Sequence, residues 1–281
     1  DAGPGVADAV RAEDAALQRA AVLAAVMRPA EELWGLIAPL LHAPDEGVRM
    51  AAVQTAMTWG LRAGWEQCVR EARRGNADAL AWVGMLGDEE EMGLLLEAVQ
   101  REETRHAALW ALGCSGRKAA AEECLRWIGS KDKRTAKLAA EAFGMATGVD
   151  AYADGFGANE PEDEEAPDPE EDLEQSPERA AEDALPGPAV DAFVRWWAEQ
   201  GVAFEGDHRY LRGSTRSAAR LESSLADASM RQVWPLRGEL ATRSNRPVSG
   251  PSTGRSYVLW LPARAGGLGS YPDVQRRPKW S

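Results

Sequence analysis

The chain has 281 residues, which is enough for one large domain or two modest ones with a substantial core. Its net charge of −13 comes from one segment, because residues 150–185 hold 15 acidic residues and one arginine while the remainder is nearly neutral. No apolar stretch is long enough to span a bilayer and no basic-then-apolar leader is present, so we expect a soluble, cytoplasmic protein rather than a membrane protein.

Helical periodicity runs through the first half of the chain. The first predicted helix begins near Asp14 and ends at Arg28, because the residue before a proline disfavours the helical conformation. Glu31 and Glu32 fall in the first turn of the next helix, where the positive end of the helix dipole favours acidic side chains. Further helices are predicted at residues 48–59, 65–74, 76–86, 88–99, 104–112, 118–128 and 132–146.

One sequence motif repeats between residues 77 and 148. Residues 79–87 align with residues 108–116 at a register of 29 residues, and a third copy at 138–144 ends 31 residues after Gly113. Repetition at this period is typical of stacked helix pairs, in which each unit buries its apolar face against its neighbours. We therefore expect an all-α fold, an α–α superhelix or solenoid of about four and a half helix pairs over residues 1–149.

Two glycine positions recur in the copies. The later position is where a helix must end and reverse, and we expect a left-handed backbone there. This position is held by Gly87, Gly116 and Gly148. One turn earlier, the missing side chain lets two helices approach closely, and this position is held by Gly84, Gly113 and Gly144.

The second half of the chain changes character. Residues 150–187 predict a disordered acidic linker, since they combine acidic residues and prolines with almost no aliphatic side chains. Residues 188–245 predict a small helical C-terminal segment, although Pro235 weakens its last helix, and Tyr210–Leu211 is expected to dock on the first. The tail, residues 246–281, is expected to be irregular or disordered apart from a short strand or docking peptide at 257–261.

The repeated runs at residues 105–113 and 138–148 resemble the short HEAT-like repeats of bilin-lyase-related proteins and bacterial scaffold proteins. Together with the acidic insert and residues 194–211, they resemble an uncharacterised bacterial HEAT-repeat family, some of whose members are encoded near type VI secretion clusters. The resemblance covers roughly residues 15–244; the start looks truncated, and the stretch after Pro247 departs from a helical C-terminus. It implies a helical repeat fold and supplies no catalytic residues, because fold does not determine function.

A possible metal or acid–base site lies at the start of one predicted helix. Glu102 and His106 share a helix face, and Glu103 is adjacent, which could form half of a metal site. No second histidine is expected within reach, because His42 and His208 belong to distant segments, and a solvated helix start explains the glutamates equally well. We therefore expect no metal and no cofactor.

Eleven tryptophans are unusual for a chain of this size. HEAT-like DNA glycosylases carry concave-surface tryptophans with an acidic residue, so Trp82, Trp110 and Trp127 with Glu103 are candidates for an aromatic-lined groove. However, the repeat region holds 17 basic and 22 acidic residues, which opposes DNA binding. Trp82 also aligns with Ala111 rather than with Trp110, so core packing explains the tryptophans better.

The C-terminal part is basic, with 13 Lys/Arg against 5 Asp/Glu from residue 207 onward. Arg209, Arg212, Arg216 and Arg220 are candidates for contact with nucleic acid or an acidic partner, or for folding back on the acidic linker.

No catalytic motif accompanies these features. The chain has no phosphate-cradling glycine loop and no Gly-x-Ser-x-Gly elbow, and Cys68, Cys114 and Cys124 read as small core residues in a reducing compartment. We therefore expect a non-catalytic scaffold whose solenoid surface binds a protein partner. The tail is expected to tune or mask that surface, and nucleic acid is not the expected partner. Two alternatives stay open: an enzyme of the HEAT-like lyase or DNA glycosylase type, and a secretion-system accessory or immunity-type protein.

Overall fold

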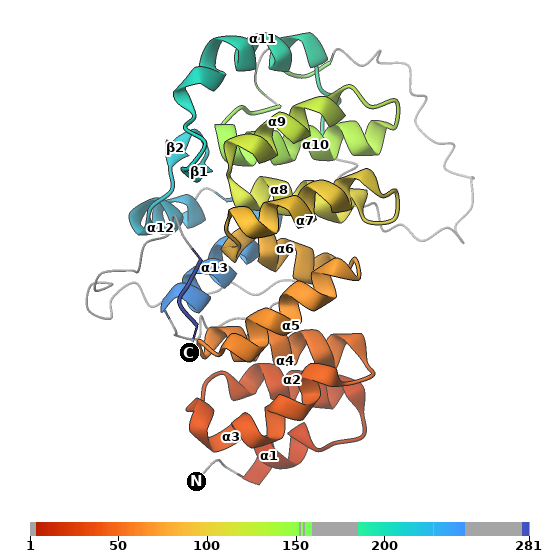
Figure 1. The fold of residues 1–281 in the computed structure, drawn as a ribbon, viewed down its shortest axis with the longest axis vertical. Coiled ribbons are helices and arrows are strands. Elements are labelled where there is room, and N and C mark those ends of the chain that lie inside the picture. The colour runs from red at the N-terminus through yellow and green to blue at the C-terminus, as the bar shows by residue number, and fades with distance from the viewer. Residues whose placement is uncertain are drawn as a thin grey trace, which may run out of the picture. The chain divides into compact units, whose positions relative to one another are not determined.

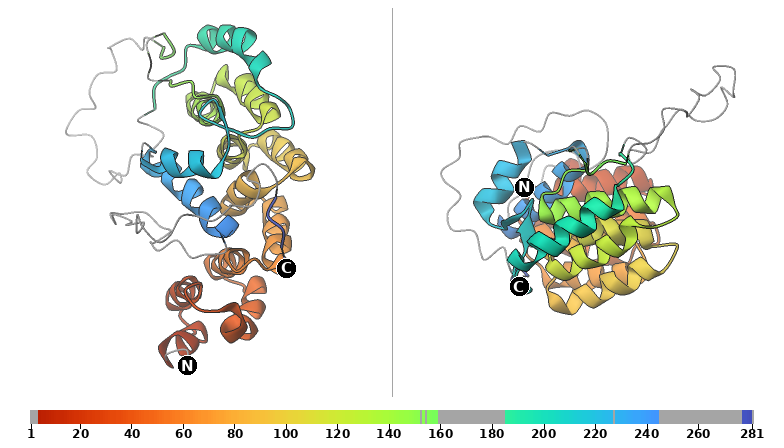
Figure 2. Two further views of the ribbon diagram at one scale, coloured as in Figure 1. Left: turned by 90° about the vertical axis from the view of Figure 1, so that its left-hand side faces the viewer. Right: turned by 90° about the horizontal axis from the view of Figure 1, so that it is seen from above.

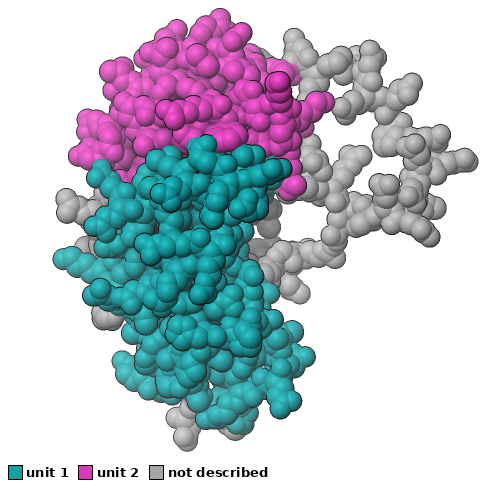
Figure 3. Space-filling model, turned by 45° about the vertical axis from the view of Figure 1, so that its right-hand side comes forward, with its two compact units in different colours: residues 1–111, 216–281 teal, residues 112–215 magenta. Residues whose placement is uncertain are grey.

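The computed structural model describes residues 4–151, 153, 155–158, 185–226, 228–244 and 277–280. These residues are mostly helical, with thirteen α-helices and a single short hairpin among them, which confirms the all-α class (Figure 1). They divide into two compact units, which are coloured separately in Figure 3: unit 1 comprises residues 1–111 and 216–281, and unit 2 comprises residues 112–215. Within the described ranges, no helix combines the length and the apolar character needed to cross a membrane.

Unit 1 is built from helices that contact one another in chain order. Helix α2 contacts α4, α4 contacts α5, α5 contacts α6, and α6 contacts α7, while α13 lies against α4 and α6 (Figure 2). The division from unit 2 falls within α8. The elements are α1 (Pro4–Val10), α2 (Ala15–Ala25), α3 (Ala30–Ile37), η1 (Ala38–His42), α4 (Glu46–Thr58), α5 (Arg62–Arg73), α6 (Ala77–Leu86), α7 (Glu89–Gln100), α8 (Arg105–Ser115), α12 (Ala218–Ala226) and α13 (Met230–Ser244).

Short polar side chains begin several helices, as the sequence predicts at most of these positions. Each accepts a hydrogen bond from the backbone N–H three residues later, which satisfies one of the unpaired donors of the first turn. The four capping residues are Asp14, Asp45, Asn76 and Asp132. At the start of α7, Asp88 and Glu91 form a reciprocal capping box, in which Glu91 Oε2 accepts from the Asp88 backbone N–H at 2.8 Å.

Two of the predicted close approaches are present, one in each unit. A Cβ atom added to Gly84 would lie 2.1 Å from the carbonyl oxygen of Ala111, and one added to Gly113 would lie 2.8 Å from the Cα of Ala142. Both contacts join a helix to one about a repeat further along the chain. The prediction is wrong for Gly144, whose added Cβ would meet the Val149 carbonyl just after its own helix rather than a neighbouring helix.

The glycines predicted to reverse the chain give a mixed result. Gly116 and Gly148 adopt the left-handed conformation, with φ values of 64° and 82°, as expected. Gly87 has φ −71° and ψ 157°, so that prediction is wrong. The extended backbone at Gly87 leads straight into the capping box of α7, so no left-handed residue is needed between the two helices.

Unit 2 combines helices with an unpredicted hairpin. Its elements are α9 (Lys118–Ile128), α10 (Lys133–Thr147), α11 (Val190–Gln200), η3 (Gly201–Ala203), β1 (Tyr210–Leu211) and β2 (Ser214–Thr215). The strands pair antiparallel around a two-residue turn in which Arg212 and Gly213 both have positive φ. Strand β1 contacts α10, and the Tyr210 N–H donates to the Gly116 carbonyl at 2.7 Å.

An aromatic cluster forms the core of unit 2. The ring of Phe143 on α10 lies 5.5–5.9 Å from those of Phe193, Trp196 and Trp197 on α11. Phe193 is completely buried. The helix predicted after Pro188 is therefore confirmed, and its apolar face packs into unit 2 rather than remaining at the surface.

Parts of the predictions lie outside the described residues. These are most of the acidic linker at residues 150–187 and the strand or docking peptide at residues 257–261. The helix predicted at residues 233–240 is present as part of α13, with Pro235 inside it.

Candidate functional site

A groove in unit 1 is occupied along one side by the chain's own residues 277–280. It has a volume of about 1300 Å³ and is lined by α5, the first turn of α7, the end of α13 and the chain's own residues 277–280. Both its walls and its occupant belong to unit 1. The residues that carry the argument are Trp65 and Val69 on α5 and Asp88 and Glu91 at the start of α7.

The local sequence explains why these side chains are there. Trp65 and Val69 are four residues apart on α5 and share one face of that helix. Helix α7 begins with an unbroken acidic run, residues 88–91, which the positive end of its dipole stabilises. The capping box then orients Glu91, because one of its oxygens is already held by the Asp88 N–H.

The basic end of the occupant is held at two points. The backbone N–H of Arg277 donates to Asp88 Oδ1 at 2.8 Å, and its Nη1 donates to Glu91 Oε1 at 2.7 Å. Glu90 Oε2 lies farther away, at 3.9 Å from the same nitrogen. Glu91 therefore caps the helix with one oxygen and binds the guanidinium with the other, a charge-assisted hydrogen bond.

The aromatic end of the occupant stacks on α5. The rings of Trp280 and Trp65 lie 5.8 Å apart between centroids with an interplanar angle of 17°. Pro278 stands between the two anchors; its ring fixes its own φ and disfavours a helical backbone at Arg277. The groove can thus hold a short segment by a charge at one end and an aromatic ring at the other.

Sequence reasoning did not single out this groove. Trp65, Glu91, Arg277 and Trp280 were all missed as site residues. A usable signal was present, because the acidic run at residues 88–91 is matched by the Arg-Arg-Pro-Lys-Trp run at the end of the chain.

The candidate tryptophans each have a partner within their own unit. Trp82 is buried, 1 % exposed, and its ring meets that of Trp234 edge-on at 5.5 Å. The Trp110 ring lies 5.1 Å from the guanidinium carbon of Arg231. In unit 2, the Trp127 Nε1 donates to Glu123 Oε1 at 3.0 Å, and the predicted carboxylate, Glu103, is exposed.

A smaller polar pocket of unit 1 does include Trp82. It has a volume of about 390 Å³, and Arg19, Glu46, Asp78 and Trp234 also line it. Burial raises the pKa of Asp78 above its usual value, nearby Glu46 raises it further, and Arg19 opposes the shift. A carboxyl group with a raised pKa in an aromatic pocket is the type of feature that marks some active sites.

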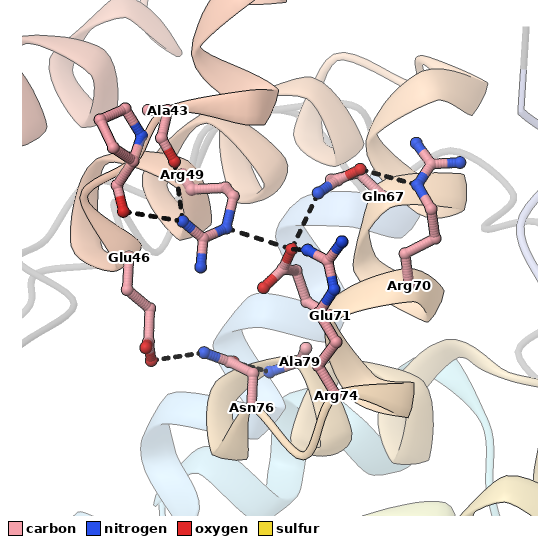
Figure 4. A network of polar contacts seen from close by, with 10 residues as sticks. Ala43, Glu46, Arg49, Gln67, Arg70, Glu71, Arg74, Asn76 and Ala79 are labelled. Atoms are coloured by element: carbon pink, nitrogen blue, oxygen red, sulfur yellow. Dashed lines mark hydrogen bonds and ion pairs between the residues drawn. The ribbon is translucent and has the colours of Figure 1, made fainter.

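A charged network ties α4 to α5 (Figure 4). The carboxylate of Glu71, 2 % exposed, accepts from Arg74 at 2.7 Å and from Gln67 at 2.9 Å, and it pairs with Arg49 at 3.1 Å. Arg49 also donates to the Ala43 carbonyl at 2.7 Å. Because Glu71 is surrounded by partners on both helices, we interpret the network as structural.

The predicted metal candidates are not brought together. Among the described residues, the group with metal-ligating geometry is Glu205, Asp207 and His208, not Glu102, Glu103 and His106. The His208 Nδ1 lies 2.9 Å from Asp207 Oδ1 and 3.0 Å from Glu205 Oε2, so these residues form a polar cluster at the surface by themselves. Exposed clusters of this kind do not by themselves indicate a metal.

The four arginines proposed for partner contact are divided by burial. Arg209 is completely buried and its Nε donates to the Ser115 carbonyl at 2.8 Å. Arg216 is 4 % exposed and pairs with Glu239 at 2.7 Å. Neither is placed to meet an external partner, whereas Arg212 and Arg220 are half-buried.

The cysteines behave as the sequence predicts. Cys68, Cys114 and Cys124 are free thiols in the core. Burial raises the pKa of Cys68 and of Cys124, and nearby Glu71 and Glu123 add to the respective shifts. High pKa values disfavour the thiolate, so these two side chains are not activated nucleophiles.

The comparisons with known proteins add no candidate function. A scan against models of protein families matched none, and searches of curated proteins and of solved structures returned no significant match.

Proposed function

We propose that the protein is a non-catalytic protein-binding scaffold, and that the groove between α5 and α7 is a surface through which it binds a partner. One observation carries this proposal: along one side, the groove already holds a short stretch of polypeptide, residues 277–280, through two hydrogen bonds and a tryptophan stack. A surface that accommodates one peptide segment has the shape and polar groups to accommodate another.

The proposed architecture is a HEAT-like solenoid. It is supported by the chain-order contacts from α2 to α7 and by the glycine contact that joins α6 to α8 about one repeat later. Stacked helix pairs offer extended, rigid surfaces, which suit partner binding better than small-molecule chemistry. The three buried free thiols are consistent with the reducing environment of the cytoplasm, which is part of the proposal.

The test begins with a partner identified by cross-linking and affinity purification from the native host. The groove variant is Val69→Glu, which places a charge on the wall, and its control is Glu97→Lys, an exposed position of α7 that does not line the groove. We expect partner affinity to fall about tenfold or more in Val69→Glu and to stay unchanged in Glu97→Lys. Equal binding by both variants would contradict a role for the groove.

An enzyme remains the second candidate, because of the pocket that holds Asp78 and Trp82. The raised pKa of Asp78 would let it serve as a general acid beside Glu46. Release of a base from alkylated duplex DNA by the wild type, and its loss in Asp78→Asn, would support a glycosylase; no release by the wild type would remove this candidate. A secretion-system accessory role has only the family resemblance behind it.

A further inference from the structure

We propose that the groove between α5 and α7 recognises a peptide carrying an arginine followed three residues later by a tryptophan, and that residues 277–280 are a built-in competitor for it. The inference deepens the proposed function and rests on it. It identifies the chemistry of the partner and assigns the end of the chain a regulatory role, in which a partner must displace Arg277 and Trp280.

The arginine position is specified by two acceptors with different tasks. Asp88 accepts from the backbone N–H of Arg277, a contact that any residue except proline can make, so it sets the register of the peptide. Glu91 accepts from the guanidinium and therefore selects the side chain. The neighbouring acids of the first turn of α7, Glu89 and Glu90, add negative charge that disfavours an acidic residue at this position.

The tryptophan position is specified by the stack on Trp65. That ring is 5 % exposed, and its near-parallel arrangement with Trp280 requires a flat partner. Arg277 and Trp280 belong to one short segment, so both anchors are filled together when that segment binds in this register. Proline at the second position lowers the entropy lost on binding, because its backbone is already restricted.

The contacts of residues 277–280 are suited to being replaced by those of a competing peptide. Arg277 keeps a third of its side chain exposed, and Lys279 is exposed, so the segment lies at the surface rather than in the core. Thirty-two residues separate it from the end of α13. Binding within one chain corresponds to an effective concentration on the order of millimolar, so the tail suppresses weak peptides while a tighter or multivalent partner displaces it.

The experiment uses the full chain and a fluorescein-labelled peptide with the sequence of residues 274–281. Binding is measured by fluorescence anisotropy for three proteins: the wild type, the tail variant Arg277→Ala/Trp280→Ala, and the control Glu97→Lys. We expect the tail variant to bind the peptide at least about tenfold more tightly than the wild type, because the groove is vacated. Glu97→Lys should behave as the wild type does, since Glu97 is exposed and does not line the groove.

Peptide variants then test the recognition rule on the tail variant. Replacing the arginine that corresponds to Arg277 by glutamate, or the tryptophan that corresponds to Trp280 by alanine, should each weaken binding about tenfold. Circular dichroism and the melting temperature of each protein establish that the variants are folded.

Each outcome decides the inference. Equal peptide affinity for the wild type and the tail variant, no peptide binding by a folded tail variant, or binding that ignores both anchor residues would overturn it. The proposed function fails separately, if the partner purified from the host binds Val69→Glu as well as it binds the wild type. If Val69→Glu weakens binding of the partner but the tail variant binds the partner as the wild type does, the proposed scaffold function stands. The proposal that residues 277–280 compete with the partner is then wrong.

Discussion

Both units take up a segment from much later in the chain, but they hold it in different ways. In unit 2, Arg209 is completely buried against the end of α8 and the adjacent Tyr210 pairs its backbone with Gly116. In unit 1, Arg277 is one-third exposed and its acidic partners lie at the start of α7. The first attachment is part of a core, and the second is a surface contact.

The difference indicates which attachment can be released. Removing Arg209 from unit 2 would strip a carbonyl of its partner in the interior, where unpaired polar groups are costly. Arg277 keeps a third of its side chain exposed while its partner Glu91 is 10 % exposed, so this pair is only partly buried and solvent can take over the contacts of Arg277 on release. A permanent attachment and an exchangeable one are thus distinguished by burial.

The largest expected effect tests the permanent attachment. Arg209→Ala should lower the free energy of unfolding by about 3 kcal/mol, because it leaves a cavity and an unsatisfied Ser115 carbonyl. The measurement is urea unfolding followed by circular dichroism. The control, Arg195→Ala on the exposed face of α11, should change stability by less than about 0.5 kcal/mol. Similar small effects for both would show that the hairpin region is not part of the core.

The next prediction tests whether a glycine allows two helices to approach closely in each unit. Gly84→Ala in unit 1 and Gly113→Ala in unit 2 should each destabilise by about 2–3 kcal/mol, because the new methyl meets backbone atoms that cannot move aside easily. Gly93→Ala on α7 is the matched control. Nothing lies within 4 Å of its added Cβ, so alanine should stabilise that helix by about 0.5–1 kcal/mol. If Gly84→Ala and Gly113→Ala were as stable as the wild type, the two glycines would not be required for close helix packing, which would contradict their repeated structural role.

A smaller effect is expected at the exchangeable attachment. Trp280→Ala removes the stack on Trp65 and should lower the free energy of unfolding by about 1 kcal/mol or less, measured by the same urea titration. A loss as large as that of Arg209→Ala would mean that the tail is a structural element of unit 1, and the contrast between the two attachments would disappear.

The smallest effect concerns the pH dependence of unit 1. Burial raises the pKa of Asp78, so the folded state binds its proton more tightly than the unfolded state does. The stability contributed by this group is therefore present at low pH and is lost as the pH rises past its ordinary value. The melting temperature of the wild type relative to Asp78→Asn should fall by about 1 °C between pH 4 and pH 7. A constant difference, or one that grows, would contradict the raised pKa.

Much of the local structure could be read from the chain because its signals are local. Asp14 and Asn76 begin helices through hydrogen bonds to residues three positions later, and Gly116 and Gly148 end helices with a left-handed backbone. The buried thiols also followed from composition. The failure at Gly87 has the same origin, since a capping box starting at the next residue replaced the expected reversal.

The candidate site could not be predicted from the sequence because it joins residues that are far apart in the chain. Arg277 and Glu91 are 186 positions apart, and neither belongs to a motif that names the other. The acidic run and the basic tail indicated only that some pairing was possible. Trp82, which was singled out for its type, proved to be a core residue against Trp234.

By itself, the order of amino acids determined most of the helices, several of their caps and two glycine positions where helices approach, Gly84 and Gly113, since each depends on neighbours within a few residues or on a regular period. Only the tertiary structure decided that Arg209 lies in a core and Arg277 on a surface, although both are arginines in a basic C-terminal region. The reason is physical: burial and ion pairing depend on which distant surfaces meet, and that is settled by the packing of the whole unit.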